Sequence, residues 1–249
     1  MNKISIIIPM LNEADHIKNL LEHIIENSKA KNIAEIIVVD GGSTDNSTEI
    51  VSSFNTATYN EKENSEKALN MARPKVFLFT SKRGRAKQMN VGTKAASGNI
   101  LYFLHADSFP PKNFDQLIIN EVEKDNLAGC FRLQFKSAHW WLRLASWFTK
   151  FNWSICRGGD QSQFITKNLF HEIGGFNENY TIYEDNILIQ ELYNRKQFVV
   201  INKKIETSAR LYEKHGVWKL QYHFWTIYIK KWLGASPDSL FAYYKKHIC

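Results

Sequence analysis

The sequence predicts an α/β domain built around a mostly parallel β-sheet. Two short runs rich in β-branched residues, 3–9 and 33–39, are each followed by signals that open a helix. Such alternation of strand and helix is typical of parallel strands joined by helical crossovers. A third run, 100–107, has the sequence ILYFLHAD and predicts another buried strand, which ends in a carboxylate.

The composition is that of an ordinary globular protein with a sizeable core: 249 residues, 44% hydrophobic and 23% charged. A net charge of +7 favours anionic partners, such as a phosphorylated substrate or a membrane surface. The basic residues are dispersed and form no known nucleic-acid motif, so we expect no nucleic-acid partner. Three widely spaced cysteines, with neither a signal peptide nor a long apolar run, indicate the cytoplasm, with peripheral contact to the inner face of the membrane as an open alternative.

In the first half, the strand 3–9 stops at a proline, and Asn12 to Asp15 open a helix with one apolar face. The strand 33–39 ends on Asp40, and a Gly-Gly turn leads into the next helix. Further along we expect a polar surface insertion at 55–67 and a third strand at 75–80. A helix at 84–96 then leads to the run 100–107, which is the fourth strand in chain order.

The second half loses this strict alternation. We expect strands at 128–135, 198–201 and 205–208, an aromatic segment at 139–153, a loop at 157–161, and helices at 169–173, 184–195, 217–233 and 240–247. The last two helices are amphipathic and rich in aromatic residues. This change of pattern predicts that the second half builds an acceptor side on a nucleotide-binding first half.

The end of the fourth strand carries the first candidate site. Side chains alternate along a strand, so His105 and Asp107 should point the same way, off the carboxyl end where ligands of open α/β sheets bind. A carboxylate there suits a hard divalent cation that is completed by substrate phosphate oxygens. In the alternative interpretation, Asp107 only forms the turn before Pro110 and Pro111.

Several motifs together resemble the family 2 glycosyltransferases. They are IIPMLNE at 7–13, VVDGGSTD at 38–45, HAD at 105–107, and the pair Glu184-Asp185 after GGF at 174–176. A closer likeness, to the small selenodomain-associated transferase 2 group, lies in GRAKQMNVGTKAASG at 84–98, GGDQ at 158–161 and SAR at 208–210. The likeness covers nearly the whole chain except the insertion at 55–67.

The resemblance implies a GT-A-like, Rossmann-type, mostly parallel sheet flanked by helices, with C-terminal amphipathic helices. It implies one domain over 1–249, with a nucleotide-sugar-binding half at 1–107 and an acceptor-binding half at 108–249. The implied reaction is an inverting, metal-assisted transfer, with Mg²⁺ or Mn²⁺, from a nucleotide-diphosphate sugar to a hydroxyl of a glycan, a lipid-linked acceptor or a small molecule. The processive Gln-x-x-Arg-Trp motif is absent, which favours single or few transfers.

The same resemblance implies roles for individual residues. Asp185 is the expected general base, with Glu184 steering the acceptor. The other implied positions are donor contacts at Pro9, Asn12, Glu13, Asp40, Arg85, Asn90, Asp107 and Arg210, acceptor contacts at Asp160 and Gln161, and metal ligands at Asp107 and His105. Several of these residues also have a plain structural interpretation: a helix cap for Asp185, a turn-former for Asp40, a solvated basic loop for Arg85, a surface Asx-turn for Asp160 and Gln161, and a helix cap or surface ion pair for Arg210.

Two departures from the family pattern matter. Gly41 follows Asp40 where many members have a second aspartate, which leaves the choice between uracil and guanine open. His105 replaces the first aspartate of the metal motif, so Asp107 becomes the main expected metal contact.

Other interpretations stay open. The rival functions are a non-catalytic nucleotide- or glycan-binding protein and a nucleotidyltransferase, although the latter usually has a basic Gly-rich loop where this chain has PMLNEAD at 9–15. The aromatic residues of 140–153 are interpreted as core, and those of 217–233 either as core or as an interfacial membrane helix.

Overall fold

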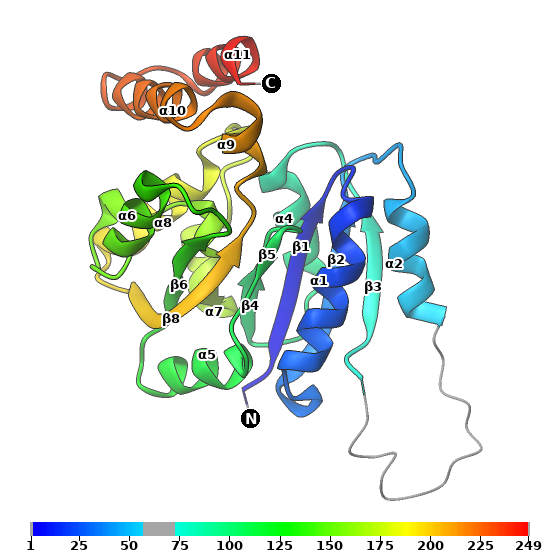
Figure 1. Cartoon of the computed structure of the whole chain (residues 1–249). Coiled ribbons are helices and arrows are strands. Elements are labelled where there is room, and N and C mark those ends of the chain that lie inside the picture. The colour runs from blue at the N-terminus through cyan, green and yellow to red at the C-terminus, as the bar shows by residue number, and fades with distance from the viewer. Residues whose placement is uncertain (1, 57–72, 249) are drawn as a thin grey trace, which may run out of the picture.

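The computed structural model describes residues 2–56 and 73–248. Within them, eight strands form one sheet in the order β3-β2-β1-β4-β7-β6-β8-β5, with helices packed on both of its faces (Figure 1). The sheet continues from the first half of the chain into the second, because β4 pairs with β7.

The first half is a parallel sheet with helical crossovers, as the sequence predicts. Strands β1, β2, β3 and β4 run parallel to one another, and β1 is buried at every position. The elements are β1 (Ile4–Met10), α1 (Ala14–Asn27), β2 (Ile33–Asp40), α2 (Ser47–Thr56), β3 (Val76–Thr80), α4 (Arg85–Ala95) and β4 (Ile100–Phe103).

The second half mixes strand directions. β7 is antiparallel to β4 and to β6, β8 is parallel to β6, and β5 is antiparallel to β8. The elements are β5 (Ser108–Phe109), α5 (Phe114–Glu123), β6 (Ala128–Phe135), α6 (Trp140–Phe148), β7 (Gln163–Thr166), α7 (Lys167–Ile173), α8 (Glu184–Asn194), β8 (Val199–Thr207), α9 (Arg210–His215), α10 (Val217–Trp232) and α11 (Pro237–His247).

Four details differ from the sequence prediction. β1 runs through Pro9 to Met10. Proline has no N–H to donate, but β4 pairs with β1 only as far as Ile7, so no hydrogen bond between β1 and β4 is lost at Pro9. β4 stops at Phe103, which leaves the HAD motif in the turn after it. Two strands were predicted at 198–201 and 205–208, but the structure has one strand, β8, with an irregularity in its pairing to β6. Elements β5, α5, α6, β7 and α9 were not predicted as strands or helices, and residues 57–67 of the predicted insertion lie outside the described part of the chain.

The core has two main clusters, one on each face of the sheet. Successive residues of β1 alternate between them: Ile6 and Ile8 pack with α1, whereas Ile7 packs with α4. A Cβ on Gly92 of α4 would lie 2.5 Å from Cγ2 of Ile7, so a glycine is what lets this helix approach β1 so closely. A smaller third cluster joins α10 and α11, at the end of the molecule where β1 and β2 have their carboxyl ends (Figure 1).

Candidate active site

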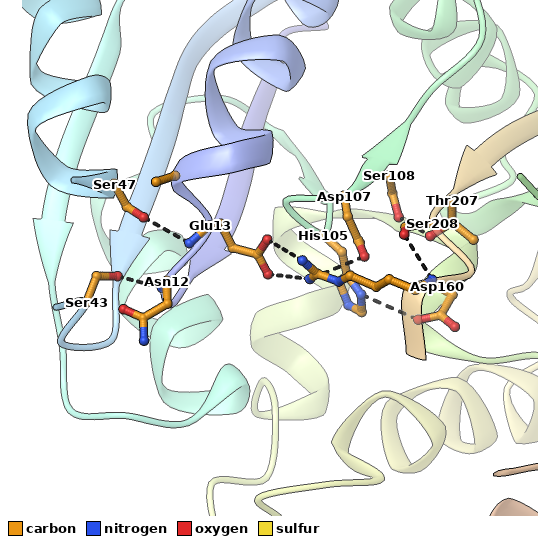
Figure 2. Close-up of polar contacts among 12 residues, drawn as sticks. Asn12, Glu13, Ser43, Ser47, His105, Asp107, Ser108, Asp160, Thr207 and Ser208 are labelled. Carbon is orange, nitrogen blue, oxygen red and sulfur yellow. Dashed lines mark hydrogen bonds and ion pairs between the residues drawn. The ribbon is translucent and has the colours of Figure 1, made fainter. Parts of the chain in front are cut away.

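The loops after β1 and β2 are locked together by side-chain hydrogen bonds. The Thr44 N–H donates to Oδ1 of Asn12 at 2.8 Å, and the Asn12 N–H donates to Oγ of Ser43 at 2.9 Å (Figure 2). The buried carboxylate of Asp40 accepts from the Gly42 N–H at 3.0 Å and from the Ser43 hydroxyl at 2.5 Å. Asp40 therefore forms the turn, and its contact with a nucleotide stays a prediction.

A guanidinium from the second half crosses to this edge of the sheet. Arg210, at the start of α9, donates to both oxygens of Glu13, at 2.9 and 2.5 Å, and lies 3.4 Å from Oδ2 of Asp107. Glu13 and Asp107 approach each other from neighbouring loops in Figure 2. Burial raises the pKa of Asp107 above its usual value, although the nearby His105 and Arg210 charges oppose the shift.

His105 faces the loop that contains Asp160. Its Nδ1 lies 3.6 Å from Oδ1 of Asp160, and the imidazole is mostly buried (Figure 2). Burial alone would lower the pKa of His105, but attraction to the carboxylates of Asp160 and Asp185 outweighs it, so the pKa is raised. The imidazole is therefore biased toward its charged form.

Gly159 leaves room for Asp185 and His105 to pack closely against its backbone. A methyl group on Gly159 would lie 2.1 Å from Oδ2 of Asp185 and 3.1 Å from Cε1 of His105, so only a residue without a side chain leaves room for this approach. Asp185 is 7% exposed in the first turn of α8 and comes from the second half of the chain. The sequence prediction gave Gly159 no role; its place beside Asp160 in the GGDQ motif was the only available signal.

Glu184 is fully buried beside Arg85. The Arg85 Nε lies 2.7 Å from Oε1 of Glu184, yet neither carboxylate oxygen accepts a hydrogen bond of good geometry within the described residues. Burial raises the pKa of Glu184; Arg85 opposes the shift and Asp185 adds to it. The Arg85 side chain is 41% exposed, so this arginine reaches from a buried carboxylate to solvent. Glu184 thus contacts Arg85, and its predicted contact with an acceptor stays a prediction.

Three other predicted residues have their side chains engaged elsewhere or buried. Asn90 is bound to the loop after α7, since it donates to the Phe176 carbonyl and to Glu178, both at 2.9 Å. Gln161 is buried, and its amide accepts from Arg157 and donates to the Cys156 carbonyl. Pro9 is buried within β1. The functional roles predicted for these three residues stay predictions.

The donor set fits a cation that the substrate completes. In the described residues, no cluster of three or more His, Cys, Asp or Glu side chains could hold a metal ion. Mg²⁺ is commonly bound by one or two protein carboxylates plus substrate phosphates, and Asp107 supplies such a carboxylate. Oδ2 of Asp107 lies 3.4 Å from the cationic Arg210, so a bound cation would share this carboxylate with the guanidinium.

The family model described as "Glycosyl transferase family 2" matches residues 5–177. The chain is 33% identical over 107 residues to the glycosyltransferase AglE of Haloferax volcanii, covering 43% of this chain and 31% of that protein. It is 29% identical over 154 residues to the undecaprenyl-phosphate 4-deoxy-4-formamido-L-arabinose transferase of Proteus mirabilis, covering 60% and 40%. These matches therefore span well under half of the relatives' own length.

Solved structures share the fold. The mannosyltransferase PcManGT of Pyrobaculum calidifontis, in complex with GDP-Man and Mn²⁺, matches with a TM-score of 0.65 and 17% identity, covering 99% of this chain and 68% of that one. TarS 1–349 of S. aureus, in complex with UDP, matches with a TM-score of 0.62 and 17% identity, covering 83% and 60%.

Proposed function

The chain belongs to glycosyl transferase family 2, and we propose that it transfers a sugar from a nucleoside-diphosphate sugar to an acceptor hydroxyl with inversion at the anomeric carbon. Its fold is the GT-A type, with a mostly parallel sheet flanked by helices. One observation carries the proposal: Gly159 lies against both Asp185 and His105, two residues before Asp107 in the chain, so carboxylates from both halves of the chain are close to one imidazole.

Asp185 is the proposed general base. The acceptor oxygen forms a bond to the anomeric carbon while the bond from that carbon to the diphosphate oxygen breaks, and the electron pair leaves with the nucleoside diphosphate. The acceptor's proton passes to Asp185 as its oxygen becomes more acidic. The start of a rigid helix fixes the position of this carboxylate, and Gly159 leaves it free of contact with a side chain on that side.

The donor is proposed to bind over the loops after β1, β2 and β4. Residues 1–107 form the proposed nucleotide-sugar-binding half, and residues 108–249 form the acceptor-binding half. Arg85 and Arg210 are each more than two-fifths exposed and carry forked donors that suit a diphosphate. Glu13 and Glu184 hold these two guanidinium groups before the donor arrives.

Mg²⁺ or Mn²⁺ is the proposed cofactor, held by Asp107, with His105 beside it, and by the donor's phosphate oxygens. When bound, it would offset the charge that develops on the leaving diphosphate. The exposed Asp160 is the proposed acceptor contact, because Gln161 is buried. The cytoplasm is the proposed compartment; Cys130 and Cys156 are free thiols, and burial raises the pKa of Cys130 to about 11.

The test is a donor panel. UDP-, GDP- and dTDP-sugars are titrated calorimetrically with Mn²⁺ and with EDTA, and slow donor hydrolysis is followed by NMR, which identifies the anomer formed first. We expect one base to bind, with metal-dependent affinity that Asp107→Ala abolishes, and a product of inverted configuration. Equal affinity in EDTA would overturn metal assistance. Tight donor binding with no hydrolysis, and no transfer to any of a range of acceptors, would identify a binding protein instead.

A further inference from the structure

Helix α10 exposes a continuous stripe of aromatic and aliphatic side chains. Its inner face buries Leu220 and Ile227 against α11. On the outer face, residues spaced three or four apart are each about half exposed or more: Trp218, Tyr222, Trp225, Ile229 and Trp232, at 51, 61, 46, 56 and 84%. A helix that is apolar on both faces needs a second apolar environment, which the described protein does not provide on this side.

Helix α6 extends the stripe. Trp141 of α6 lies 5.3 Å from Trp218 and 6.0 Å from Trp225 between ring centroids, and its indole N–H donates to Gln221 at 3.2 Å. The outer side of α6 carries the exposed residues Trp140, Leu144, Trp147 and Phe148. We call the exposed residues of α6 and α10 named here the aromatic face. Of the seven tryptophans in the chain, five belong to it, and Trp153, just after α6, is also exposed.

The aromatic face has basic residues and no acidic residue along its helices. Segments 140–155 and 217–233 contain Arg143, Lys150 and Lys219, and neither segment contains an Asp or Glu. Lys230 and Lys231 also lie in α10, but their ammonium groups pack on Tyr243 and Tyr180 at its inner side. The Lys150 ammonium lies 3.8 Å from the centroid of a Trp147 ring, so a positive charge sits directly on the exposed indole.

We propose that the aromatic face binds the surface of an anionic lipid bilayer. Tryptophan and tyrosine rings favour the boundary between acyl chains and headgroups, and the basic side chains complement anionic headgroups. No helix in the described part of the chain has the length and apolar character of a membrane span, so this contact is with one leaflet only.

The aromatic face is connected to the acceptor side of the site. Tyr228 of α10 packs edge-on against Tyr183, which immediately precedes the acid pair, with ring centroids 5.3 Å apart. Lys231 donates to the Tyr180 hydroxyl at 2.6 Å. These contacts tie the inner side of α10 to the segment that leads to Asp185, so a bilayer on the aromatic face would lie across this one helix from that segment, and the acceptor would be an amphiphile held in the membrane. Only this last step rests on the proposed function.

The experiment is co-sedimentation with phosphatidylcholine vesicles made with and without phosphatidylglycerol. We expect binding to the anionic vesicles at low salt and release at high salt, because screening weakens surface attraction. The charge variant Arg143→Glu/Lys219→Glu should weaken partitioning by about tenfold or more. The apolar variant Ile229→Ser/Trp232→Ser should also weaken it, and both of its positions are exposed enough to leave folding intact.

Two control variants make the same kinds of substitution at exposed positions outside the aromatic face. Lys18→Glu/Lys94→Glu changes two exposed lysines of α1 and α4, and Phe77→Ser/Phe79→Ser changes two exposed aromatic residues of β3. These controls should bind vesicles like the wild type, and Asp185→Asn should as well, which separates this test from that of the catalytic proposal. The proposal is overturned if the wild type binds neither vesicle, or if it forms a dimer that Ile229→Ser/Trp232→Ser abolishes, which would assign the face to a second copy.

Discussion

The two halves of the chain treat their polar groups near the site in different ways. In the parallel half, Asn12, Asp40 and Asp45 accept hydrogen bonds from the backbone of adjoining loops, so their side chains are already engaged. In the half with mixed strand directions, Glu184 is buried without a well-formed hydrogen bond. Asp185 can lie close to Gly159, which also lies against His105, only because Gly159 has no side chain. The comparison indicates that the first half is a preformed cradle, whereas Glu184 and Asp185 of the second half, whose roles in the reaction are proposed, stand in a costly environment.

The largest effect should come from Asp185→Asn. Asparagine keeps the shape but cannot accept the proton, so turnover should fall about a hundredfold to ten-thousandfold, with little change in thermal midpoint. Turnover, melting and donor affinity are measured together. The control is Asp238→Asn, an exposed aspartate in the first turn of α11. Normal turnover in Asp185→Asn would place the base elsewhere, with Asp160 and Glu184 as the next residues to test.

Substitution of one glycine in each half tests the contrast between a structural first half and a reactive second half. Gly159→Ala would push the Asp185 carboxylate aside, and a displacement of that size costs about a hundredfold in turnover. Gly92→Ala would crowd Ile7 in the core and should cost about 1–3 kcal/mol of stability while the folded fraction keeps its turnover. Denaturant melts and kcat per folded molecule test both. The contrast between the two halves is wrong if Gly92→Ala lowers kcat or if Gly159→Ala changes only stability.

Arg210 belongs to the second half but acts on the first. Charge-assisted hydrogen bonds are each worth about 1.5–3 kcal/mol, so Arg210→Ala should weaken nucleoside-diphosphate binding about tenfold to a hundredfold. Because the side chain is 47% exposed, its loss should cost under about 1 kcal/mol of stability. Calorimetry with UDP or GDP measures the effect. Arg195→Ala, which likewise removes ion pairs to two carboxylates, should leave binding unchanged; equal losses in both variants would count against a specific role.

The smallest expected effect is on the pH dependence of stability, through Asp45 in the loop after β2. The Ser47 hydroxyl, with the N–H groups of Ala14 and Ser47, lowers the pKa of Asp45 below its usual value. A lowered folded-state pKa gives stability that is present above the unfolded value and lost as the pH falls through the folded value. The stability gap between wild type and Asp45→Asn should therefore be constant near neutral pH and shrink below about pH 4. A gap that persists at the lowest pH would mean that shape, and not charge, carries the effect.

The parallel half could be predicted closely from the sequence. Its strands are unbroken apolar runs, and its polar residues follow the strand ends directly, so position in the chain nearly fixes position in space. The strand β7 could not be found this way, because its four residues, QFIT, carry too little periodicity. The split of β8 into two strands was wrong because its polar middle, Asn202 to Lys204, marks an irregularity and not an end.

The residues of the site were predicted singly, but their arrangement was not. The pairing of Glu13 with Arg210 joins positions 197 residues apart, and no local pattern records it. Gly159 gains its role only from the approach of α8, which depends on how the mixed strands pack. The exposure of the tryptophans was likewise undetermined, since apolar residues at helical spacing predict an apolar face without showing what covers it.

The bridge from Arg210 to Glu13 and Asp107 also sets an order of events during protein synthesis. Because chains fold from the N-terminus as they leave the ribosome, the parallel half can form while Arg210 is still untranslated. Until then Glu13 and Asp107 have no guanidinium between them, so these two carboxylates are not neutralised by Arg210. Under the proposed function, their charge would repel the donor's diphosphate, and the growing chain would gain affinity for the donor once β8 and the start of α9 have been made and docked.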